Sequence, residues 1–140
     1  MHKKIALLLT LLGLAVAGHA ATSPAIIKTI VLKGQTTSIP PTTIFTPPTS
    51  GLFRISVYMV ATGGFDNLGN WNAKINWTDD AGPESTVSWL SLNAFTPPNA
   101  WAQNSIVIEA AAGEPATISI SAGTQYPGPT YSLFLVVEQI

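Results

Sequence analysis

The chain has 140 residues, of which 46% are hydrophobic and only 9% charged, and its formal net charge at pH 7 is −1. It contains no cysteine, and its two histidines, His2 and His19, both lie within the first 20 residues. After residue 20 the chain therefore cannot form disulfides, zinc sites built from Cys or His, or catalytic systems that need either residue. Nor does its charge favour nucleic acid, which needs a basic patch.

Residues 1–20 have the layout of a secretory signal peptide. Two lysines precede the thirteen-residue apolar run 5–17, and the small residues Gly18 and Ala20 occupy the −3 and −1 positions of a cleavage site. Because the run is shorter than the ~20 residues that span a bilayer, we expect cleavage and not a membrane anchor. The predicted mature chain keeps four basic and seven acidic side chains, a net charge of −3, and has no membrane span. We expect it to be secreted, periplasmic or on the cell surface.

Residues 21–50 are interpreted as an N-terminal strand followed by a Pro-rich spacer. Residues 25–32 alternate with the period of two that is typical of a strand, and 35–39 is a second, short extended segment. We expect this second segment to end at Pro40-Pro41, because proline cannot donate a hydrogen bond to a β-ladder.

Residues 51–140 are predicted to form the body of a single β-sandwich domain. Turn residues separate short strands, and no segment carries a 3.6-residue apolar stripe, so the fold class is all-β: an antiparallel sandwich, a jelly roll of about eight strands. Residues 79–83 are a hairpin turn, and 93–103 are a loop. The strands expected in this part are, in order, 52–61, 71–78, 86–92, 105–110, 116–121 and 130–140.

Two of these strands have informative faces. In 130–140 the residues Tyr131, Leu133, Leu135 and Val137 share one face, while Phe134 and Val136 make the opposite face apolar as well. Such a strand is either covered by loops of its own chain or buried in a subunit contact, and both interpretations stay open. In 52–61, Phe53, Ile55, Val57 and Met59 are predicted to point inward. The outward Arg54 and Tyr58 form either a solvated face or a subunit contact, where both residue types are favoured.

Four sequence blocks occur in a recognisable order. They are Phe45-Thr46-Pro47 with the segment SGLFRISVY (50–58), the hairpin INWTDDAG (75–82), the turn AAGEPA (111–116) and the terminal strand YSLFL (131–135). Together they resemble the C1q/TNF-like jelly roll, in particular its minimal bacterial and phage-type versions, over most of residues 43–140. The resemblance implies a homotrimer with a recognition, adhesive or structural role.

Acidic residues gather in one part of the sequence, at Asp66, Asp79, Asp80 and Glu84. Carboxylates on two turns could supply calcium, which takes six to eight oxygen ligands. Alternatively, Asp79 and Asp80 simply build the hairpin turn. We predict no cofactor. Calcium is the one ion that these carboxylates are candidates to bind.

Three aromatic residues, Phe95, Trp101 and Tyr126, are expected in loops beside prolines. They would either stack on sugars and fill a partner's pocket, or cap the open end of the sandwich. A paired-carboxylate glycosidase would need two facing carboxyl groups, but Glu109 and Glu138 are expected to be solvated strand residues. We therefore predict that the protein is not an enzyme.

These observations predict an exported, non-enzymatic β-sandwich protein with a structural, adhesive or ligand-recognition role. It would self-associate as a homo-oligomer through the face that carries Phe134 and Val136, with a glycan or protein as a further partner and no nucleic acid. Two alternatives remain open. One is a fibre- or pilus-like subunit that assembles by strand addition with residues 25–32, and the other is a carbohydrate-binding module that uses Trp101 and Tyr126.

Overall fold

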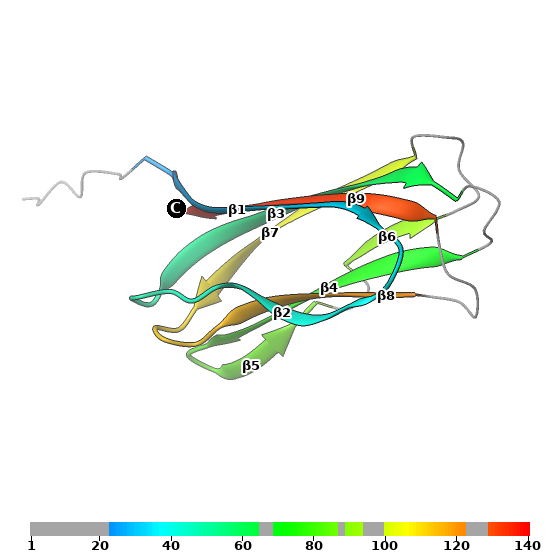
Figure 1. Cartoon of the computed structure of the whole chain (residues 1–140). Helices are drawn as coiled ribbons and strands as arrows, with labels where there is room; N and C mark the ends of the chain where they lie inside the picture. Colours follow the sequence, from blue (N-terminus) through cyan, green and yellow to red (C-terminus); the bar gives the residue numbers. More distant parts are fainter. Residues whose placement is uncertain (1–22, 65–68, 87–88, 94–99, 123–128) are drawn as a thin grey trace, which may run out of the picture.

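A computed structural model describes residues 23–64, 69–86, 89–93, 100–122 and 129–140. These residues form nine strands in two antiparallel sheets that lie one above the other (Figure 1). The four-stranded sheet has the order β1 (Ala25–Gln35), β9 (Thr130–Gln139), β3 (Gly51–Gly63) and β7 (Trp101–Ala110). The five-stranded sheet has the order β2 (Ile39–Phe45), β8 (Ala116–Ala122), β4 (Asn70–Asp79) and β5 (Gly82–Ser85), with β6 (Leu90–Asn93) also paired with β4.

The core lies between the sheets and is built from alternate residues of the strands, because successive side chains on a strand point to opposite faces. The predicted inward residues of β3 are all buried, and so is the face of β9 that carries Tyr131, Leu133, Leu135 and Val137. Ile118 and Ile120 of β8 are buried as well. Trp71 is buried against Tyr131, with 5.1 Å between the ring centroids, and its Nε1–H donates to the carbonyl oxygen of Pro129 at 2.6 Å. Trp71 is therefore part of the core.

Tyr131 also ties β9 to the connection between β1 and β2. Its hydroxyl donates to the carbonyl oxygen of Thr37 at 3.1 Å. Desolvation by burial raises the pKa of Tyr131 to about 12, because the phenolate form loses its hydration. The hydroxyl is therefore protonated, and available as a donor, throughout the neutral range.

The expected strand end at Pro40-Pro41 is wrong. β2 begins at Ile39 and continues through both prolines to Phe45, paired with β8. The prolines are accommodated because β2 is an edge strand and because the register with β8 shifts between Ile39 and Thr42. β1 is also longer than predicted and reaches Gln35.

The predicted turn after β4 is present, and it is tighter than expected. The strand resumes at Gly82, whose φ of 129° favours glycine, and Oδ1 of Asp79 accepts hydrogen bonds from the backbone N–H groups of Ala81 and Gly82. The returning arm, expected as one strand over 86–92, comprises β5 and β6, both paired with β4. This division accounts for nine described strands where about eight were expected.

The predicted signal peptide, residues 1–20, lies outside the described residues. Within the described ranges, a search for a helix that could span a membrane finds none.

Candidate functional site

Most of the large hydrophobic side chains that are exposed in the described chain lie on the four-stranded sheet, and five of them lie on its outer face. This face also contains Phe134 and Val136 of β9, both partly exposed, as predicted for a strand with two apolar faces. The registers place Phe134 between Val31 of β1 and Tyr58 of β3. The five exposed large hydrophobic side chains on this face are Trp101 58%, Val107 50%, Leu52 49%, Val31 48% and Tyr58 37%. We call this surface the outer apolar face.

An aromatic row crosses three neighbouring strands of this face. The ring of Tyr58 on β3 lies 5.9 Å from that of Phe134 on β9 and 6.1 Å from that of Trp101 on β7, with interplanar angles of 45° and 31°. Aromatic pairs at such separations and tilts attract one another. The structure thus brings together three residues that the sequence singled out for separate reasons.

The placement of Trp101 in a loop is wrong. Trp101 is the first residue of β7 and pairs with Val60 of β3. The ladder continues one residue further, since the N–H of Ala61 donates to the carbonyl oxygen of Ala100 at 2.8 Å. A strand that begins at Trp101 points Trp101, Gln103, Ser105 and Val107 outward by alternation. This alternation was the signal that could have added β7 to the predicted surface.

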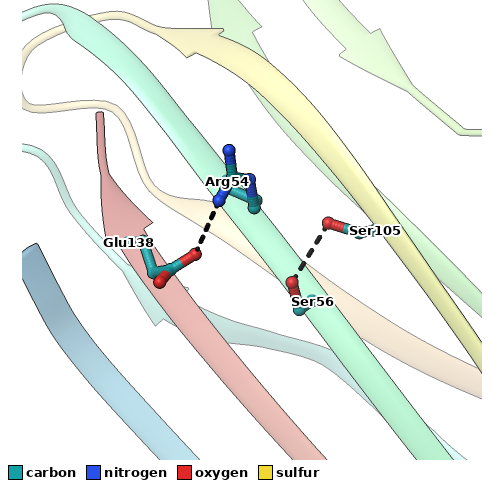
Figure 2. Close-up of polar contacts among 4 residues, drawn as sticks. All are labelled: Arg54, Ser56, Ser105 and Glu138. Carbon is teal, nitrogen blue, oxygen red and sulfur yellow. Dashed lines mark hydrogen bonds and ion pairs between the residues drawn. The ribbon is translucent and has the colours of Figure 1, made fainter. Parts of the chain in front are cut away.

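Two pairs of polar side chains on the outer apolar face are joined by hydrogen bonds (Figure 2). Nη1 of Arg54 on β3 lies 3.3 Å from Oε2 of Glu138 on β9, and both side chains are partly exposed. On the other side of β3, the hydroxyls of Ser56 and Ser105 share a hydrogen bond of 3.0 Å. Glu138, which was expected to be solvated, is therefore ion-paired, whereas Glu109 is exposed.

A hollow of about 540 Å³ opens beside the aromatic row. It is lined by residues of β3, β7 and β9: Ser56, Val57, Tyr58, Gln103, Asn104, Ser105, Phe134 and Val136. The two hydrogen-bonded serines are the smallest of the outward-pointing side chains that line it.

The acidic residues are not gathered into a metal site within the described chain. Asp79 is engaged by the hairpin turn, Asp80 and Glu84 are exposed, and Asp66 lies outside the described residues. No group of three or more His, Cys, Asp or Glu side chains with a metal-binding arrangement occurs among the residues described. Phe95 and Tyr126 also lie outside the described residues.

Comparison with known proteins identifies the fold. No protein-family model matches the sequence, and no curated protein matches it either. Among solved structures, the globular domain of zebrafish complement 1qA aligns with 81% of this chain and 95% of its own length, with a TM-score of 0.54 and 14% identity. The Eiger TNF of S. frugiperda aligns with 81% of this chain and 92% of its own length, with a TM-score of 0.41 and 10% identity. The chain has the C1q/TNF-like jelly-roll fold that the sequence blocks predicted.

Proposed function

We propose that the mature chain is an exported, non-enzymatic protein with a binding or structural role, and that it self-associates through the outer apolar face. The observation that carries this proposal is the uncovered aromatic row of Tyr58, Phe134 and Trp101. Scattered exposed hydrophobic residues are ordinary, but a contiguous patch across several strands is typical of an interaction site.

The dimensions of the face suit a protein partner. A ten-residue strand such as β9 is about 33 Å long, and four strands side by side are about 19 Å wide. The plan area is on the order of 600 Å², and the side chains add to it, whereas a standard interface buries about 800 Å² on each partner. Contact would therefore have to cover the whole face, with its projecting side chains, to reach the area of a standard interface.

The polar groups of the face favour a second copy of the chain over a sugar. A sugar is recognised by free donors and acceptors, but Arg54 and Glu138 already pair with each other, and so do Ser56 and Ser105. A protein surface that covered these pairs would keep the hydrogen bond within each of them, which lowers the cost of burying their polar groups. The resemblance to C1q/TNF-like domains supports a trimer as the assembly.

The test measures the oligomeric state of residues 21–140 by sedimentation velocity over a wide concentration range. We expect the native chain to associate and Phe134→Lys to be monomeric, because the variant places a charge in the middle of the contact. Ser121→Lys is the matched control, since Ser121 is exposed on the five-stranded sheet. This variant should associate as the native chain does. Circular dichroism checks that all three are folded. A native chain that stays monomeric throughout would refute the proposal.

A further inference from the structure

We propose that the indole of Trp101 from one copy inserts into the hollow beside Ser56 and Ser105 of a neighbouring copy. This inference rests on the proposed self-association and adds a specific contact to it. The two parts of the contact are a protruding side chain, of which 58% is exposed although it packs beside Tyr58, and a recess on the same sheet.

Trp101 has the properties of the inserting residue. Its exposed fraction of 58% is the largest of the tryptophans, since Trp71 is buried and both Trp77 and Trp89 pack against the core. It lies at the start of β7, which is an edge strand of the four-stranded sheet. From an edge, a side chain reaches a neighbouring molecule without the sheets having to overlap completely. Tryptophan is also among the residues that most often dominate binding energy at protein interfaces.

The hollow has the properties of the receiving site. Its volume of about 540 Å³ is in the range of sites that enclose small ligands, and therefore accommodates one indole. The rings of Tyr58 and Phe134 and the side chain of Val136 supply apolar contacts. Because the hydroxyls of Ser56 and Ser105 share one hydrogen bond, an apolar group that covers them deprives only one of the two O–H donors of a partner, which lowers the cost of covering the pair.

Trp101 cannot fill the hollow of its own chain. It is opposite Val60, whereas Ser105, which pairs with Ser56, is four residues further along β7. Four residues of strand correspond to about 13 Å, and the indole packs beside Tyr58. The contact therefore joins two different parts of the surface. Contacts of this kind between copies generate closed rings when the rotation closes, which agrees with a trimer.

Two substitutions test the contact from its two sides. Trp101→Ala removes the inserting group, and Ser105→Phe fills the hollow while leaving Trp101 in place. We expect each to raise the dissociation constant of the assembly about 10- to 100-fold, as is typical of a hot-spot residue. Because both changes abolish the same contact, the double variant should be little weaker than either single variant. Ser121→Phe on the other sheet is the matched control and should have no effect.

Cross-linking locates the contact directly, because the native chain has no cysteine. Two single-cysteine variants, Gln103→Cys and Ser56→Cys, are made with tags of different mass, allowed to co-assemble and treated with a short bismaleimide. Each chain carries one thiol, so a product that contains both tags must join two copies. We expect this product, and we expect its absence when Lys74→Cys replaces Ser56→Cys, since Lys74 lies on the other sheet.

The outcomes separate this inference from the proposed function. If the native chain associates but Ser105→Phe associates equally well and the mixed product is missing, the Trp101 contact is refuted and the self-association stands. If the native chain is monomeric at every concentration, both are refuted. A concentration-dependent blue shift of tryptophan emission in the native chain that is lost in Trp101→Phe would support the contact independently.

Discussion

The two sheets have similar inner faces but very different outer faces. On the five-stranded sheet, the registers align outward residues of β4 with those of β8, and the aligned pairs are all polar: Asn72 with Ser121, Lys74 with Ser119, and Asn76 with Thr117. On the four-stranded sheet the aligned pairs include Tyr58 with Phe134 and Ser56 with Val136. Both sheets obey the same alternation, so the difference lies in the outward residues alone: those of the five-stranded sheet are polar, whereas those of the four-stranded sheet include the apolar side chains on which the proposed self-association rests.

The largest effect should come from the core that both sheets share. Trp71→Ala on β4 removes a buried indole and its hydrogen bond to Pro129, so we expect a loss of about 3–5 kcal/mol in the free energy of unfolding. Its chain neighbour Asn72 points outward, and Asn72→Ala should change this free energy by no more than about 0.5 kcal/mol. Urea denaturation measures both. Equal effects would contradict the assignment of the inner and outer faces.

The second effect distinguishes the two outer faces. Phe134→Lys should weaken self-association at least about 10-fold, since an aromatic side chain contributes ~1.5–3 kcal/mol when removed from water. Ser121→Lys, on the polar outer face, should leave the dissociation constant unchanged. Light scattering on both variants at matched concentrations compares how strongly each one associates. Equal weakening of association would mean that the two faces do not differ in function.

A smaller effect should come from the ion pair on the outer apolar face. Glu138→Leu leaves Arg54 without its partner in a covered surface, so we expect association to weaken by roughly 1 kcal/mol. Adding Arg54→Met removes the unpaired charge and should restore the native affinity or exceed it. Sedimentation equilibrium on the single and double variants gives the coupling between Arg54 and Glu138 in the free energy of association. If the double variant associated more weakly than the single variant, burial of this pair in the contact would be contradicted.

The smallest effect concerns Tyr131, whose hydroxyl contacts the β1–β2 connection between the sheets. Tyr131→Phe removes one neutral hydrogen bond, so we expect a loss of about 0.5–1.5 kcal/mol. The raised pKa of about 12, against 10.0 for an unperturbed tyrosine, also predicts a pH dependence. Above pH 10 the unfolded chain releases this proton and the folded chain keeps it, so native stability falls between pH 10 and 12.

That fall should be less steep in the Phe variant, which can be checked by urea titration at several pH values. An identical slope in both proteins would contradict the assignment of the raised pKa to Tyr131.

The sequence by itself determined the fold class and the orientation of most side chains. Alternation predicted that Phe53, Ile55, Val57 and Met59 face the core and that Phe134 lies on the opposite face of its strand from Leu133, because side-chain direction on a strand is a local property of period two. The Asp79 turn was equally predictable, because an Asp side chain bonds to backbone N–H groups within three residues.

Only the tertiary structure decided which outward residues become neighbours. Tyr58, Trp101 and Phe134 are far apart in the chain, and alternation states the face of each but neither the order of the strands nor their register. The same holds for the pairs Arg54–Glu138 and Ser56–Ser105 and for the hollow beside them. Strand order and register depend on how the two apolar inner faces bury each other, which is a property of the whole domain and of no single segment.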